Sequence, residues 1–278
     1  MTDSSRTETT PAPIYLQDYQ PPAWLVDTVD LQFVLRDNDT EVTATLAIHR
    51  NSKVAKQPLR LQAEELQLHA ISLDGQLLDD SQYQLSTTML EIQDLPDECS
   101  ITTVTRINPA DNTSLMGLYQ SSGNFCTQCE AEGFRKITFF PDRPDILSIY
   151  KVTVLAEKDR FPVLLSNGNL VQSGDAEPDD SGNPRHFAVW HDPHPKPSYL
   201  FALVAGRLAR IHDEFTTQSG KQVDINIYVE PHNSDKCQHA MRSITKAMRW
   251  DEQTYGREYD LEVFNVVAVD DFNMGAME

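Results

Sequence analysis

The sequence has few cysteines and contains no long apolar run. Four cysteines in 278 residues are too few for a disulfide framework. No stretch reaches the roughly 18 apolar residues that a membrane-spanning helix needs. The polar residues 1–13 also lack the apolar core of a secretory signal. We therefore expect a cytoplasmic protein that does not enter a membrane.

Positive charge is scarce: 23 Lys and Arg residues face 42 Asp and Glu residues, which gives a formal net charge of -19. Such a surface repels phosphate backbones and anionic lipid headgroups. We therefore expect neither nucleic acid nor a membrane as a partner. The same charge would draw cationic ligands, including free amino termini, towards a suitable cleft.

Most of the chain up to about residue 207 shows the two-residue alternation of β-strands. Residues 29–35 and 42–48 alternate on either side of a turn at 37–39, which predicts a hairpin. Further short strands are expected at residues 59–61, 66–70, 89–92, 102–107, 150–155, 161–165 and 187–190. Residues 108–135 and 174–185 are expected to be loops. The pattern predicts a mainly β fold, an antiparallel sandwich or saddle.

The pattern changes after Gly206, where we place a domain boundary. A strand is expected near residues 223–228, then a helix that Asn233 or Ser234 caps and Gly256 ends. A buried strand should follow at 263–269. The predicted units are a disordered tail over 1–13, a β-rich domain over 14–207 and the start of a second domain over 208–278. Because the chain stops just after a buried strand and a glycine turn, we expect it to be truncated.

Five segments, in this order along the chain, resemble one enzyme family. They are Gly117–Gln120, Cys126–Arg135, Phe140–Asp145, Lys196–Ala202 and the final Gly275-Ala276-Met277-Glu278. The last is similar to the start of a Gly-Ala-Met-Glu-Asn motif. Together the segments resemble the gluzincin zinc aminopeptidases, the aminopeptidase N family, in their bacterial form.

The resemblance implies a saddle-like antiparallel β domain followed by the start of a thermolysin-like α/β catalytic domain. It implies a parent enzyme that releases N-terminal amino acids from peptides with a free N-terminus. We expect this parent to be a monomer. Two alternatives remain: a non-catalytic β-rich module that binds peptides or a partner protein, and the epoxide-hydrolase branch of the same superfamily.

The resemblance also implies an amine-binding site. Glu278 would be the main carboxylate for the substrate ammonium group and Glu130 the second, since carboxylates form charge-assisted hydrogen bonds with such a cation. The backbone of Gly275, Ala276 and Met277 would run beside the substrate, where the glycine permits close approach. Two further contacts are implied: Gln128 would supply a polar group and Met274 an adaptable apolar wall.

Without the family match, Glu130 is an ordinary solvated loop acid, Glu278 a terminal acid without meaning, and Met274 and Met277 are core or turn residues. Glu132 is expected to have a structural role. Asp271 departs from the family pattern, because bacterial relatives usually have an aromatic residue there. Its carboxylate adds negative charge near the implied site.

The sequence contains no His-Glu-x-x-His segment, whose spacing places two imidazoles on one helix face to bind zinc. The resemblance implies that the zinc of the parent is bound by residues beyond Glu278, so we assign no metal ligand and no general base. The eight histidines form no recognisable metal pattern, and His212 is isolated in the sequence.

Cys126 and Cys129 have the spacing of half a zinc site or of a redox pair. No second cysteine pair completes four zinc ligands, and no βαβ pattern surrounds a redox motif. We interpret them as two thiols in a loop, which could still oxidise to a local disulfide.

Overall fold

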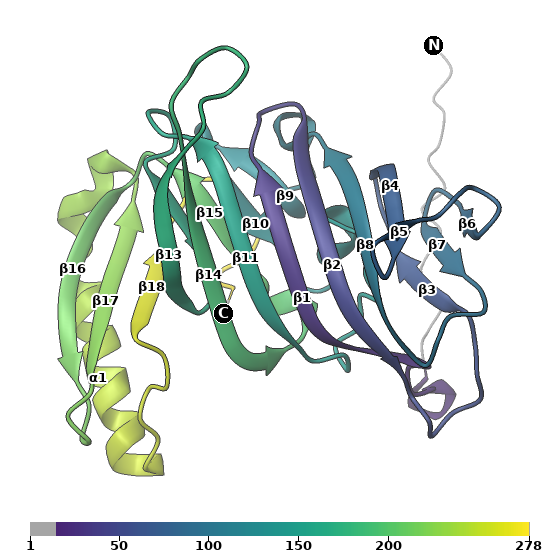
Figure 1. Cartoon of the computed structure of the whole chain (residues 1–278). Coiled ribbons are helices and arrows are strands. Elements are labelled where there is room, and N and C mark those ends of the chain that lie inside the picture. Colours follow the sequence, from purple (N-terminus) through teal and green to yellow (C-terminus); the bar gives the residue numbers. More distant parts are fainter. Residues whose placement is uncertain (1–14, 278) are drawn as a thin grey trace, which may run out of the picture.

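The computed structural model describes residues 15–277, and its main elements are β-sheets (Figure 1). The tail predicted over residues 1–13 and the site residue Glu278 lie outside this range. Among the described residues, no helix is both long and apolar enough to cross a membrane. The prediction of a mainly β fold is confirmed.

A large eight-stranded sheet dominates the fold (Figure 1). The predicted hairpin at its centre is confirmed, with Phe33 paired to Val42. The pair of β1 (Trp24–Val34) and β11 (Ser148–Glu157) is parallel, and the other neighbours are antiparallel. In spatial order the strands are β13 (Asn169–Ala176), β14 (Arg185–Lys196), β11 (Ser148–Glu157), β1 (Trp24–Val34), β2 (Thr40–Arg50), β8 (Glu98–Ile107), β4 (Gln67–Leu73) and β5 (Gln76–Leu77).

Two smaller sheets share one apolar core with the large sheet. The four-stranded sheet contains β12 (Val163–Ser166), β15 (Leu203–Gly206), β10 (Asn124–Gln128) and β9 (Gly117–Ser121). The three-stranded sheet contains β3 (Leu59–Gln62), β7 (Met89–Ile92) and β6 (Tyr83–Leu85). Alternation along the strands explains the core: in β2, for example, Val42, Ala44, Leu46 and Ile48 are buried. Each large apolar side chain buried in this way contributes roughly 1.5–3 kcal/mol.

The loop predicted over residues 108–135 is only partly a loop. It contains the hairpin of β9 and β10, in which nearly every residue is buried. Burial on both faces removes the polar–apolar alternation that is typical of a half-buried strand. The alternation pattern therefore predicts no strand at these residues. Short 3-10 helices complete the β-rich part: η1 (Leu16–Asp18), η2 (Pro109–Asp111), η3 (Phe134–Lys136) and η4 (Ser198–Leu200).

After Gly206 the chain builds a separate three-stranded sheet of β16 (Ala209–Thr216), β17 (Gln222–Val229) and β18 (Val263–Val267). The odd-numbered residues of β17 pack with Met241 and Met248 of helix α1 (Gln238–Tyr255) and form a second apolar cluster. The predicted strand at 263–269 is present but half-buried, because within the described residues it pairs only with β17.

The helix α1 ends as predicted and begins elsewhere. Gly256 has φ +62° at the C-cap, and its backbone N–H donates to the carbonyl of Glu252 at 3.1 Å. Neither Asn233 nor Ser234 caps the helix, because both lie inside the 3-10 helix η5 (Pro231–Lys236). The residue before α1 is Cys237, which makes no side-chain cap.

Candidate functional site

The hairpin of β9 and β10 positions the loop that carries Glu130. Its register pairs Gln128, the last residue of β10, with Gly117, the first residue of β9. Two glycines let the following loop fold back on this end. A Cβ on Gly133 would lie 2.5 Å from the carbonyl oxygen of Gln128, and Gly117 has φ +73° with Lys136 close by. Larger residues at these positions would push the loop away from the hairpin.

Gln128 and Glu130 lie together at this end of the hairpin. The Gln128 side chain is fully buried, and its Oε1 accepts from the backbone N–H of Glu130 at 3.4 Å. Its Nε2 has no hydrogen-bond partner among residues 15–277. Glu130 is half-buried, and its carboxylate forms no ion pair with a described cation. The half-buried Glu130 carboxylate is therefore unpaired among the described residues and open to a ligand, whereas the unpaired Nε2 of Gln128 is buried behind it and has no exposed surface.

The neighbouring Glu132 differs from Glu130 in both exposure and pairing. Its side chain is 67% exposed and binds Nη1 of Arg135 at 3.1 Å. This arrangement is consistent with the structural role expected from the sequence. The exposed ion pair of Glu132 and Arg135 lies within one loop and contributes little to stability.

The C-terminal segment docks along β9. The hydroxyl of Tyr119 donates to the backbone carbonyl of Asp271 at 3.0 Å, and Ser121 bonds both the N–H and the carboxylate of Asp271. Further on, Nδ2 of Asn273 donates to the carbonyl of Leu115 at 3.2 Å. The segment thus runs antiparallel to β9.

The antiparallel direction indicates where residues 275–277, whose backbone is predicted to lie beside the substrate, follow in space. Because Asn273 lies beside Leu115, just before Gly117, we infer that residues 274–277 continue towards the end of the hairpin that holds Gln128. Met274, Gly275 and Ala276 are exposed and Met277 is half-buried. A Cβ on Gly275 would meet no atom within 4 Å, so the space beside it is open. Glu278 lies outside the described residues.

Asp142 ties together the segments that surround Glu130. Its buried carboxylate accepts from Nε of Arg135 at 3.1 Å and from the hydroxyl of Ser198 at 2.6 Å. Its backbone N–H donates to Oε1 of Gln62. From the sequence, Asp142 has no role of its own and is only one residue of the segment Phe140–Asp145. The only signal was that the segments containing Arg135, Asp142 and Ser198 all belong to the family pattern.

Aromatic rings from the same segments pack beneath the loop. The Phe134 ring lies 5.0 Å from that of Phe140 and 5.3 Å from that of Phe201, in edge-to-face geometry. Tyr150 of β11 completes the group at 6.2 Å. These contacts add about 0.5–1.5 kcal/mol per pair beyond the buried area. They hold the loop on rigid neighbours, which a precise binding site requires.

The two spaced cysteines are buried free thiols. Burial, with smaller contributions from the nearby Glu230 and Asp271 carboxylates, raises the pKa of Cys126 to about 12. Burial also raises the pKa of Cys129 well above its usual value. Since the thiolate is the reactive form, these raised pKa values and the burial of both thiols disfavour redox chemistry at this pair.

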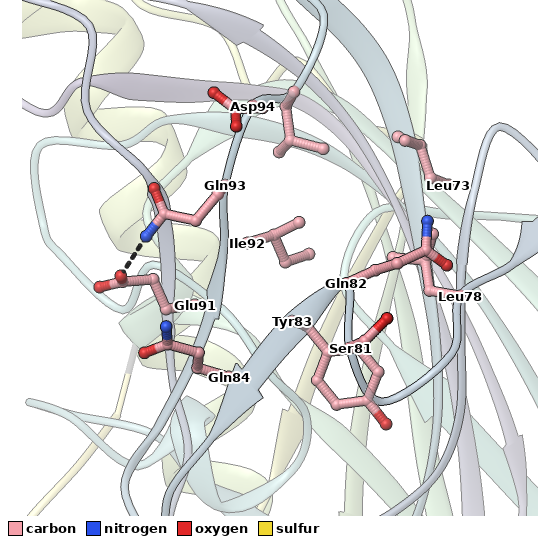
Figure 2. A pocket seen from close by; sticks show the side chains of 11 residues that line it. Leu73, Leu78, Ser81, Gln82, Tyr83, Gln84, Glu91, Ile92, Gln93 and Asp94 are labelled. Carbon is pink, nitrogen blue, oxygen red and sulfur yellow. Dashed lines mark hydrogen bonds between the residues drawn. The ribbon is translucent and has the colours of Figure 1, made fainter.

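Two hollows lie elsewhere on the surface. One, of about 360 Å³, lies between β4 and the sheet of β6 and β7, with Ile92 and Leu78 among its walls and Nε2 of Gln93 donating to Glu91 at 2.6 Å (Figure 2). The other, of about 470 Å³, lies at the turn of the β9–β10 hairpin, the opposite end from Gln128. No predicted site residue lines either hollow.

The described residues supply no zinc site beside Glu130. The one group of three histidine, cysteine or carboxylate side chains that is close enough to share an ion within residues 15–277 is His212, Glu214 and Asp224. It lies on β16 and β17, in another sheet, and has no His-Glu-x-x-His helix. No step of a metal-dependent reaction follows from the residues of this chain.

Nearly the whole of this chain aligns with bacterial proteins named aminopeptidase N. Aminopeptidase N of Caulobacter vibrioides is 49% identical over 273 residues, which are 98% of this chain and 31% of that protein. Aminopeptidase N of Escherichia coli is 44% identical over 264 residues, 95% of this chain and 29% of that protein. The chain therefore spans about 30% of the length of these relatives.

Solved structures show the same fold. Aminopeptidase A of Legionella pneumophila, in complex with aspartic acid, superposes with a TM-score of 0.86 at 35% identity, over 94% of this chain and 30% of that one. An M1 zinc metallopeptidase of Deinococcus radiodurans shares the fold alone, with a TM-score of 0.71 at 16% identity over 88% of this chain and 56% of that one. Residues 22–200 match the peptidase M1 N-terminal domain, which is more than half of the chain, and the chain therefore belongs to this family.

Proposed function

We propose that the whole protein is a zinc-dependent aminopeptidase that releases N-terminal amino acids from peptides. In this proposal Glu130 and Glu278 hold the substrate ammonium group, and Gln128 adds a polar contact. The backbone of Gly275, Ala276 and Met277 lies beside the substrate, and Met274 lines the pocket for its first side chain. The protein acts as a monomer on peptides with a free N-terminus.

One observation carries the proposal: the Glu130 carboxylate is half-buried without a cationic partner among residues 15–277. We infer that residues 274–277 follow at the same end of the hairpin, because Asn273 bonds the carbonyl of Leu115. A partly desolvated carboxylate gains most when a cation binds it, because attraction strengthens as water is excluded. A substrate ammonium group supplies that cation. The Legionella relative was solved with a free amino acid, the kind of product that an aminopeptidase releases.

The zinc of such an enzyme would be bound by residues outside this chain. The spacing that zinc peptidases use on a helix is absent from the sequence, and the relatives are about three times as long as this chain. The chain contributes the substrate-binding side of the site, and the chemical step belongs to the remainder. We therefore expect the 278-residue chain alone to have no peptidase activity.

The test compares a free and a blocked amine on the whole protein. We expect the whole protein to hydrolyse alanine p-nitroanilide and to leave the N-acetylated substrate intact, because only the free ammonium group pairs with Glu130 and Glu278. A zinc chelator should abolish turnover, and added zinc should restore it. Equal hydrolysis of both substrates, or enzyme-like turnover by the 278-residue chain, would contradict the proposal. Binding of peptides without any hydrolysis would favour the non-catalytic module.

A further inference from the structure

A second cluster of ligand-type side chains lies on the sheet of β16, β17 and β18. His212 is isolated in the sequence but not in the fold. Its Nε2 lies 3.0 Å from Oδ1 of Asp224, and Glu214 completes a group whose ligand atoms all lie within 4.8 Å of one another. All three side chains are exposed.

The strand register explains this grouping. His212 and Glu214 are two residues apart on β16, so they project from the same face. Asp224 of β17 lies directly opposite Glu214. Antiparallel partners have Cβ atoms about 4.5–5.5 Å apart, so the paired backbones hold the three side chains together. The odd-numbered residues Val223 and Ile225 point to the other face, where they pack with the cluster of α1.

A hydrogen-bonded group of Arg210, Asn226 and Asn265 lies beside the cluster. Asn226, opposite His212, is 3% exposed; its Oδ1 accepts from Nε of Arg210 at 2.7 Å and its Nδ2 donates to Asn265 at 2.9 Å. Arg210 of β16 is thereby engaged by Asn226. The three ligand groups lie beside this hydrogen-bonded layer and face solvent, because all three side chains are exposed; β16, which carries two of them, is the edge strand of its sheet (Figure 1).

We propose that His212, Glu214 and Asp224 form a surface site for a divalent transition-metal ion such as Zn²⁺. One imidazole and two carboxylates are ligands that zinc accepts at about 2.0–2.2 Å. Two ligands about 2.1 Å from a tetrahedral ion are about 3.4 Å apart, so the hydrogen-bonded His212 Nε2 and Asp224 Oδ1, now 3.0 Å apart, need to separate only slightly to share an ion. Water completes the coordination, because the site faces solvent.

The imidazole selects the class of ion. Ca²⁺ and Mg²⁺ prefer sites made of oxygen ligands alone, whereas a histidine beside carboxylates suits zinc and its neighbours. A bound ion joins β16 to β17 across the ladder. Because it binds the folded hairpin and not the separated strands, it should stabilise the fold.

A matched pair on the same chain serves as the control. His49 Nδ1 lies 2.8 Å from Oδ2 of Asp27, also between neighbouring strands, but no third ligand joins them within the described residues. The comparison separates a three-ligand site from any exposed histidine with a carboxylate partner. It needs no peptidase activity and is independent of the proposed function.

The experiment is a Zn²⁺ titration of the untagged 278-residue chain by calorimetry, after removal of metal with a chelator. We expect one ion to bind to the wild-type chain and to H49Q with equal affinity. Affinity should fall at least tenfold in H212Q, and at least threefold in E214Q and in D224N. Zinc should also raise the thermal midpoint of the wild-type chain and of H49Q but not of H212Q. No zinc binding by the wild-type chain, unchanged binding by H212Q, or an equal loss in H49Q would overturn the proposal.

Discussion

The side chain of Ser121 forms two hydrogen bonds with Asp271, one with its carboxylate and one with its backbone N–H. The serine hydroxyl donates to Oδ2 of Asp271 at 3.0 Å and accepts from the backbone N–H of Asp271 at 3.1 Å. The two residues are 150 positions apart in the chain. This contact fastens the segment before Gly275, Ala276 and Met277 to the hairpin that ends at Gln128.

Removing the Ser121 hydroxyl should loosen this segment. In S121A the Asp271 N–H and carboxylate lose their partner, and two such bonds contribute about 1–3 kcal/mol together. We expect faster amide hydrogen exchange in residues 270–277, measured by mass spectrometry, with little change in the large sheet. S173A, at an exposed position of β13, is the control. Unchanged exchange in S121A would mean that the hydroxyl does not hold the segment.

Removing the Asp142 carboxylate should destabilise the whole β-rich part. D142A leaves Nε of the largely buried Arg135 and the buried Ser198 hydroxyl without their acceptor, and Arg135 keeps its solvated pair with Glu132. Breaking a buried pair in this way costs about 3 kcal/mol. Urea unfolding followed by circular dichroism measures the loss. E91Q breaks the surface pair with Arg60 and should cost below about 1 kcal/mol; equal losses in the two variants would refute the role of Asp142 as a hub.

Stability should fall in acid partly through Asp145. Two hydrogen bonds from Arg143 at 2.8 and 2.7 Å, and one from the Tyr19 hydroxyl at 2.9 Å, hold the pKa of Asp145 below its ordinary value of 3.8. The folded state therefore favours the carboxylate. This stability is present above pH 3.8 and disappears as the pH falls through the lower folded pKa.

The measurement compares the unfolding free energy of D145N with that of the wild-type chain across this range. The difference should be largest near neutral pH and should shrink as the pH falls below 3.8. D18N removes an exposed acid without an ion pair among residues 15–277 and should show no such trend. A difference between D145N and wild type that stays constant with pH would contradict the assignment.

The half-buried strands could be predicted from the sequence, and the fully buried ones could not. β1 and β2 show one polar and one apolar face, so their residues alternate. Residues of β10 are buried on both faces, and Asn124, Thr127 and Gln128 within it are polar. A buried polar strand has no alternating signal, and it is stable because tertiary hydrogen bonds, such as Thr127 Oγ1 to the Leu203 carbonyl at 3.3 Å, satisfy it.

The candidate site was recognisable in part for a similar reason. Gln128, Glu130 and residues 274–277 came from a pattern of segments, and their grouping in one site stays a prediction. The structure adds that Asp271, just before these last residues, docks on Ser121 of β9. Asp142 could not be found, because its partners Arg135 and Ser198 converge only in the tertiary structure. His212, Glu214 and Asp224 were missed because the third group comes from the next strand, and only the register places it opposite Glu214.

The central claim is that the Glu130 carboxylate binds the substrate amine, and one pair of variants tests it most directly. Steady-state kinetics of the whole protein with alanine p-nitroanilide would compare E130Q with E132Q, a neighbouring acid that binds Arg135 instead. A lost charge-assisted bond of about 1.5–3 kcal/mol predicts that kcat/KM falls roughly 10- to 150-fold in E130Q. We expect E132Q to stay within about threefold of wild type, because exposed ion pairs contribute little. An unchanged kcat/KM in E130Q, or an equal loss in E132Q, would contradict the assignment of Glu130 as an amine ligand.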